Sequence, residues 1–231
     1  MSDKFNEIYS KSIKNPEQFW KDASEDIFWF KKPNKILNKS NPPFYKWYED
    51  GVTNTCYNAL DIHIDQGKGN KTALIYDSPI TGNKSKFTYE ELRSKVSKFA
   101  GALKDQGTNK GDRVIIYMPM IPEAVVAMLA CARIGAIHSV VFGGFASNEL
   151  ASRIDDSKAK LLVTASCGFE PGRTVEYKPL VDEAIKQAQH KISKMILFQR
   201  KGHEVKLNAP MEISWDEAHA NAKDTDCVEM N

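Results

Sequence analysis

Two short stretches of this 231-residue sequence hold residue types suited to binding an anion. The first is Gly143-Gly144, whose backbone N–H groups can approach a ligand closely because glycine has no Cβ. A tight turn between a strand and a helix would explain this pair equally well. The second is Arg173, which follows Pro171-Gly172 in a chain with only six arginines among its 32 Lys and Arg residues. Its planar guanidinium suits a phosphate, although a solvated surface arginine gives the same pattern.

Other common motifs of catalytic and cofactor sites are missing from the sequence. There is no Rossmann glycine pattern, no serine nucleophile elbow and no H-E-x-x-H pair. The piece GKGNKT (67–72) lacks the spacing of a nucleotide phosphate loop. His138 lies inside a predicted strand, which favours a hydrogen-bonded core histidine. Cys167 has no nearby histidine or cation that would lower its pKa, so we interpret it as an inert thiol.

Composition and charge exclude several functional classes. Net charge is +2, which gives no electrostatic reason to expect a nucleic acid or an anionic membrane as partner. The longest apolar run, 124–132, is too short to span a bilayer, and the first residues resemble neither a secretory signal nor a transit peptide. The four cysteines are widely scattered, which predicts a reducing compartment and no structural zinc or other metal site. We therefore expect a cytoplasmic protein.

The candidate residues must be positioned by the segment 111–173, which alternates strands and helices. Pro122 suits the first turn of a helix, and the following residues are apolar almost all round, which predicts a buried helix. Ser147 is a candidate N-cap for a second helix. The resulting pattern is strand 114–117, helix 123–133, strand 136–142, helix 147–154 and strand 161–164.

This alternation predicts an α/β fold with a doubly wound parallel sheet, flanking helices and right-handed crossovers. Ligands of such sheets bind beyond the carboxyl ends of the strands. Two predicted loops, 142–147 and 165–173, lie at those ends and contain both candidate stretches. We therefore expect the binding site there.

The rest of the chain supplies further elements. Residues 1–50 are rich in aromatic side chains and predict an arm that wraps the domain with its rings buried, in preference to a surface that stacks nucleic-acid bases. A helix is expected to begin at Pro16 and end near Asp26. Beyond the arm, the patterns predict strand 72–76, a helix capped by Thr88 and Glu91, helix 180–189, strand 195–198, a loop over 199–212, and a helix capped by Ser214 and Glu217.

Several long motifs resemble one known family. The run YMPMIPEAVVAMLACARIGAIHSVVFGGFASNELASRI (117–154) closely resembles AMP-forming short-chain acyl-CoA synthetases, which belong to the adenylate-forming superfamily. FTYEEL (87–92) resembles their first core motif, and 41–63 resembles the N-terminal segment of the acetyl/propionyl branch. The stretch 165–184 is most similar to propionyl-CoA synthetases, because acetyl-type members usually have a basic residue in place of Glu170. Ile62 departs from the arginine that the family commonly has there.

The resemblance implies a reaction and a site. The family joins a small carboxylate such as propionate or acetate to ATP with Mg2+, and coenzyme A then displaces AMP from the acyl-adenylate. The resemblance implies that coenzyme A contacts Gly143, Gly144, and the loop formed by Glu170, Pro171, Gly172 and Arg173. It assigns no catalytic residue and no metal ligand to this chain, because the family's phosphate loop, acyl pocket and adenylation lysine have no counterpart in it.

The sequence is thus expected to be the N-terminal part of such an enzyme, inactive without the missing remainder as its partner. We expect an N-terminal segment over 1–66 and a partial AMP-binding α/β domain over 67–231. Two alternatives stay open: a non-catalytic module that binds coenzyme A or a nucleotide, and one half of a split synthetase.

Overall fold

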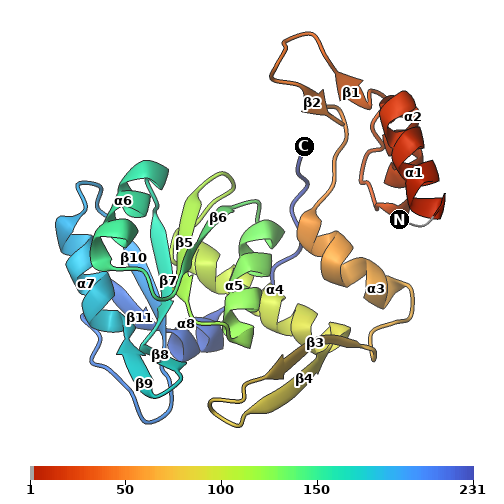
Figure 1. Ribbon diagram of the computed structural model, residues 1–231. Coiled ribbons are helices and arrows are strands. Elements are labelled where there is room, and N and C mark those ends of the chain that lie inside the picture. The colour runs from red at the N-terminus through yellow and green to blue at the C-terminus, as the bar shows by residue number, and fades with distance from the viewer. Residues whose placement is uncertain (1–2) are drawn as a thin grey trace.

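The centre of the protein is a five-stranded sheet with helices on both faces (Figure 1). The structure is a computed structural model and describes residues 3–231. All neighbouring strands of this sheet are parallel, which confirms the predicted fold class. In spatial order the strands are β11 (Glu212–Ser214), β10 (Lys194–Phe198), β7 (Leu161–Ala165), β5 (Arg113–Met118) and β6 (Ile137–Phe142).

Strand β5 shows why the sheet is buried on both sides. Successive side chains of a strand point to opposite faces. Val114 and Ile116 belong to one core cluster, with α4 (Tyr89–Asp105), α5 (Pro122–Arg133) and α8 (Trp215–Asn221). Ile115 and Tyr117 belong to the other, with α6 (Ser147–Ser157) and α7 (Tyr177–Gln187). The continuous apolar run that predicted a strand therefore supplies two hydrophobic cores.

Two antiparallel hairpins flank the sheet. The first pairs β3 (Thr72–Asp77) with β4 (Lys84–Thr88) and leads into α4 through the predicted capping box, in which Thr88 and Glu91 bond each other's backbone N–H groups. The second pairs β8 (Cys167–Glu170) with β9 (Arg173–Glu176). This second hairpin lies where we predicted only a loop over 165–173, because two short strands joined at Pro171-Gly172 carry too little apolar periodicity to be recognised.

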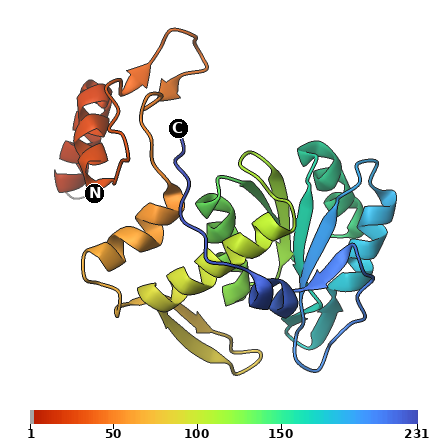
Figure 2. The ribbon, with the colours of Figure 1, turned by 180° about the vertical axis from the view of Figure 1, so that it is seen from behind.

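Residues 3–47 stand away from the sheet in both views (Figure 2), whereas residues 56–65 pack against α4 and the core beneath it. The aromatic rings of both parts are exposed or half-buried, so the predicted wrapping arm with buried rings is wrong. The rings pack mainly on one another instead, as Trp20 does on Trp47 and Phe28 on Tyr57. The elements are α1 (Asp3–Lys14), α2 (Pro16–Ala23), a 3-10 turn (Ser24–Asp26), β1 (Leu37–Asn38), β2 (Lys46–Trp47), η2 (Tyr57–Asp61) and α3 (Ile62–Asp65).

Most predicted elements are confirmed with small shifts at their ends, but three details are wrong. His138 is exposed on the edge strand β6, because no further strand covers it. The N-cap of α6 is Ala146 and not Ser147, and it makes no side-chain bond. Strand β11 was not predicted and begins at the last residue of the predicted loop 199–212, since its three residues are too few to show a pattern. No helix within residues 3–231 has the length and apolar character that a membrane span requires.

The last residues run back across α4 and α5 (Figure 2). The Ser97 hydroxyl donates to the Thr225 carbonyl and accepts from its N–H, at 3.0 and 2.9 Å. Val228 donates its N–H to the carbonyl of Arg133, at 2.9 Å. Gly101 permits this approach, because a Cβ there would overlap the Lys223 carbonyl group.

Replacing Gly101 with alanine is therefore expected to destabilise the protein, although alanine is the better helix former by about 0.5–1 kcal/mol. Overpacking against a backbone group costs about 1–3 kcal/mol. We expect a lower melting temperature and faster proteolysis near Lys223. Gly69→Ala is the control, since its nearest atom would be an ordinary 3.6 Å away. A Gly101→Ala protein more stable than the wild type would contradict this packing.

Candidate functional site

A cavity of about 570 Å³ opens at the carboxyl ends of β5 and β6, where the sequence predicted a site. Its walls come from six places: the end of β3 with the turn to β4, the segment after β5, the end of β6, the hairpin β8–β9, the start of α7, and the segment after β10. Gly143 and Glu170 line it, and so do Tyr177 and Arg200. The parallel sheet brings these separate segments together because all its strands end on the same side.

Gly143 and Gly144 are positioned by packing inside the protein. The Tyr177 hydroxyl donates to the Gly143 carbonyl, and a Cβ on Gly143 would collide with that hydroxyl and lie 2.9 Å from the Met118 carbonyl oxygen. A Cβ on Gly144 would lie 3.1 Å from the Phe142 ring. The close approach that requires glycine at 143 is thus to Tyr177, while its other side faces the cavity.

The predicted loop residues form the tip of the hairpin. Glu170 ends β8, Arg173 begins β9, and Pro171-Gly172 connects them as a two-residue turn with Gly172 at φ +76°. Proline followed by a glycine at positive φ is the pattern of a type II turn. The Pro-Gly pair was the signal for this turn, but the sequence did not reveal the strands on either side.

Arg173 and Glu170 form an ion pair at this tip. The carboxylate Oε2 of Glu170 accepts from Arg173 Nη2 at 2.6 Å and from Nε at 2.7 Å. The Arg173 side chain is 70% exposed, so the pair contributes no more than about 1 kcal/mol. The remaining N–H groups of the guanidinium are free to meet a ligand, and Glu170 reduces the net positive charge that the ligand encounters.

Two residues of the cavity were missed by sequence reasoning. Tyr177 begins α7, and its buried ring lies against both Gly143 and Gly168. Burial raises the pKa of its hydroxyl above the usual range, so it remains a hydrogen-bond donor. Arg200 follows β10 within the region predicted as loop, and its side chain is buried. Only the tertiary structure brings either residue to the site.

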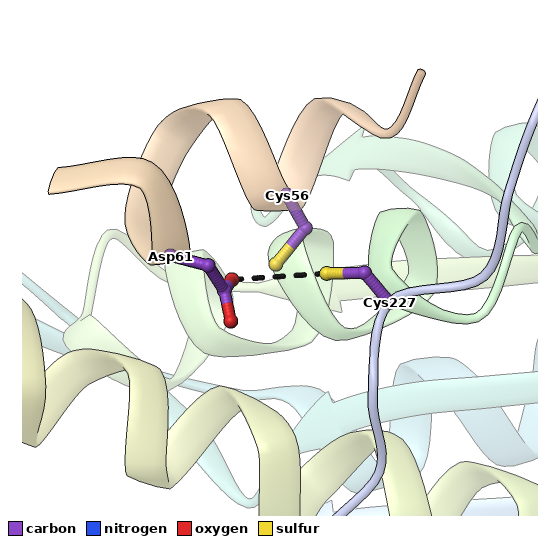
Figure 3. Close-up of side chains that lie close together, drawn as sticks. All are labelled: Cys56, Asp61 and Cys227. Atoms are coloured by element: carbon purple, nitrogen blue, oxygen red, sulfur yellow. Dashed lines mark hydrogen bonds between the residues drawn. The ribbon is translucent and has the colours of Figure 1, made fainter. Parts of the chain in front are cut away.

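A second cluster joins Cys56, Asp61 and Cys227 (Figure 3). Their sulfur and carboxylate atoms lie within 4.8 Å of one another, and the Cys227 thiol donates to Asp61 Oδ2 at 3.7 Å. No motif indicated this group, because 171 positions separate the two cysteines. A soft divalent metal would accept such donors.

Arg133 forms a buried ion pair with Asp61 of this cluster. Its guanidinium donates to Asp61 Oδ2 at 2.7 Å and Oδ1 at 2.9 Å, and to Cys227 Sγ at 3.1 Å. Burial opposes the charge of Arg133, yet the bonds from Asp61 and the adjacent sulfurs raise its pKa. The pKa of Cys227 is raised by its bond with Cys56 and by burial. One cation thus already satisfies the three groups that would have to hold a metal.

Two family models match the sequence and together extend over nearly all of it. A model described as the acetyl-coenzyme A synthetase N-terminus matches residues 5–59. A model of AMP-binding enzymes matches residues 62–228, which is most of the chain. The chain belongs to the AMP-binding enzyme family. This confirms the family that the motifs suggested.

Individual relatives and a solved structure show which members of the AMP-binding family this chain resembles. It is 53% identical over 221 residues to human acyl-CoA synthetase short-chain family member 3, mitochondrial, covering 95% of this chain and 32% of that protein. It is 43% identical over 214 residues to acetyl-coenzyme A synthetase of Streptomyces avermitilis, covering 93% and 32%. Acetoacetyl-CoA synthetase from Streptomyces lividans has the same fold, with a TM-score of 0.84, 23% identity and coverage of 96% and 33%. The chain spans about a third of the length of these proteins.

Proposed function

We propose that this chain supplies part of the coenzyme A site of an AMP-forming synthetase for short-chain acids. In this reaction Mg2+ and ATP activate a carboxylate such as propionate or acetate, and the thiol of coenzyme A then displaces AMP. The proposal rests on the family, on the names of the relatives, and on one structural observation. That observation is a cavity at the carboxyl ends of parallel strands, bordered by a hairpin whose tip carries an exposed arginine.

The residues present fit a phosphorylated ligand. The cavity is lined by several separate segments and its lining is mainly apolar, which suits the pantetheine chain of coenzyme A. Arg173 at the hairpin tip offers N–H donors in a fixed plane, which match the oxygens of a phosphate. In this proposal Arg173 binds and orients the phosphorylated end, and Gly143 allows the ligand to pass close to the backbone.

Titration of the 231-residue chain with coenzyme A tests this function. A forked, charge-assisted contact contributes about 1.5–3 kcal/mol, so Arg173→Ala is expected to weaken binding about ten- to hundredfold. Arg173→Lys should recover only part of this, because an ammonium cannot reproduce the fork. Arg93→Ala on α4, outside the cavity, is the control. Unchanged affinity for coenzyme A in Arg173→Ala, with weaker binding of ATP, would assign this loop to the other ligand.

Glu170 provides a second test with the opposite sign. Its carboxylate pairs with Arg173 and repels a phosphate, so Glu170→Gln is expected to tighten coenzyme A binding. Exposed charge interactions of this kind are worth about 0.2–1 kcal/mol, which corresponds to an increase of about one and a half- to fivefold at low salt. The gain should shrink as salt is added. Weaker binding by Glu170→Gln would instead show that the carboxylate contacts the ligand favourably.

A further inference from the structure

Three basic side chains are buried in the part of the chain that the structure describes, and one of them differs from the others. Arg133 is paired with Asp61, and Lys178 lies 2.5 Å from Asp182 and 3.1 Å from Glu212. Arg200 is only 9% exposed. Within residues 3–231 its guanidinium has no carboxylate within 4.0 Å and makes no side-chain hydrogen bond.

The position of Arg200 is fixed by the backbone. Its N–H donates to Ser166 Oγ at 2.9 Å, at the end of the neighbouring strand β7. Its carbonyl accepts from the His203 N–H at 2.9 Å, which closes a tight turn directly after β10. This turn directs the side chain into the cavity that Gly143 and Glu170 also line.

Inside the cavity, Arg200 lies against the hairpin that carries Arg173. Its guanidinium carbon is 4.7 Å from the centre of the Phe169 ring, and Phe169 immediately precedes Glu170. The stacking covers one face of the guanidinium but uses none of its five N–H donors. Glu123 is the nearby acid on α5. Burial raises its pKa and the charge of Arg200 opposes this rise, yet the two do not approach to ion-pair distance.

The guanidinium of Arg200 keeps contact with solvent through the cavity, because within residues 3–231 none of its nitrogen atoms is among the fully buried side-chain atoms that lack a hydrogen-bond partner. A cation held largely inside the protein without a partner still loses part of its hydration, which costs free energy. Most buried cations are therefore paired, as Arg133 and Lys178 are here. An unpaired one that faces an open cavity indicates that its acceptor comes from outside the chain, since binding then restores the missing hydrogen bonds.

We infer that Arg200 binds a phosphate-type oxyanion inside the cavity, on the inner side of the hairpin whose outer tip carries Arg173. The inference rests on the proposed function in one respect, namely that the ligand is coenzyme A, which has a diphosphate as well as a separate phosphate. Two arginines, one stacked on Phe169 and one at the tip of the same hairpin, can hold two such groups at once. Arg200 is then the inner contact and Arg173 the outer one.

The test compares Arg200→Met and Arg200→Lys with the wild-type chain. Methionine keeps an unbranched apolar side chain against Phe169 and removes the charge. We expect Arg200→Met to weaken coenzyme A binding at least about tenfold, with Arg200→Lys in between. Binding of pantetheine, which has no phosphate, should be unchanged. Inorganic pyrophosphate, the second probe, should bind the wild-type chain and lose affinity in Arg200→Met.

Thermal stability separates anion binding from a structural role. Without ligand, Arg200→Met should melt at the same temperature as the wild type or higher, because an unpaired buried charge has been removed. Arg133→Met is the matched control and should melt much lower, because it leaves Asp61 unpaired. A lower melting temperature for Arg200→Met, with equal losses for coenzyme A and pantetheine, would overturn the inference.

Other outcomes of these measurements distinguish the inference about Arg200 from the proposed function. If Arg173→Ala weakens coenzyme A binding and Arg200→Met does not, the inference fails and the proposed function stands. If the wild-type chain binds pyrophosphate through Arg200 but does not bind coenzyme A, the anion site stands and the proposed function fails. If the wild-type chain binds neither at millimolar concentration, both are overturned.

Discussion

Replacing Asp61 with alanine is expected to destabilise the protein by about 3–5 kcal/mol, the usual cost of leaving a buried charge without its partner. Asp61 accepts two bonds from Arg133, whose side chain is only 3% exposed. Arg133 also donates to the Thr225 carbonyl at 2.5 Å and to Cys227. The loss should therefore release both the N-terminal elements and the last residues from α5. Urea unfolding measures the change.

Two controls make this prediction specific. Glu7→Ala breaks an exposed pair with Lys11 and should leave the urea midpoint nearly unchanged, because solvent screens such a pair. The double variant Asp61→Leu/Arg133→Met removes both charges and should recover much of the lost stability, because an apolar pair of similar size often replaces a buried ion pair without loss. A single Asp61→Ala variant as stable as Glu7→Ala would show that the cluster does not hold these segments together.

Replacing Tyr177 with alanine is the second change with a large expected effect. The ring is buried between the end of β6 and the hairpin β8–β9, and truncating a buried aromatic side chain costs about 3–5 kcal/mol. Tyr177→Phe removes only the hydrogen bond to the Gly143 carbonyl and should cost about 0.5–1.5 kcal/mol. Coenzyme A binding should weaken in both, because Gly143 loses its anchor. Tyr9→Ala, on an exposed surface of α1, is the control.

The pH dependence of stability gives Tyr177 a second signature. Burial raises the pKa of its hydroxyl in the folded protein, whereas the unfolded chain has the ordinary value of about 10. Above that pH the unfolded state releases the proton and the folded state keeps it, so stability falls as pH rises. Tyr177→Phe should show a smaller decline above about pH 10 than the wild type. An identical decline would mean that the hydroxyl is not buried as described.

Sequence alone predicted those parts of the fold that depend on local pattern. The run Val114–Tyr117 is short enough to be a buried strand, and the alanine-rich segment after Pro122 is too long for a strand, so length and flanking residues decided both. The capping box at Thr88 fixed the start of α4. The hairpin β8–β9 was missed because its pairing depends on contacts between neighbouring strands more than on periodicity.

The residues of the candidate site likewise divide into those that local sequence could predict and those that it could not. Gly143, Gly144 and the segment Glu170–Arg173 could be chosen from residue type, turn chemistry and position at strand ends, which are local properties. The residues that surround them in the folded protein could not be predicted in this way. Arg200 lies in a stretch without any motif. It stands out only because the structure shows no carboxylate partner for it among residues 3–231.

The sequence by itself thus determined the family, the parallel sheet and the edge of that sheet where the cavity opens, because these follow from motifs and hydrophobic periodicity. Only the tertiary structure decided which charges are paired. It joined Asp61 to Arg133 across 72 positions and to Cys227 across 166, and it left Arg200 lining the cavity without a carboxylate partner among residues 3–231. Pairing of buried charges depends on distances of a few ångströms between segments remote in sequence, and no local pattern encodes those distances.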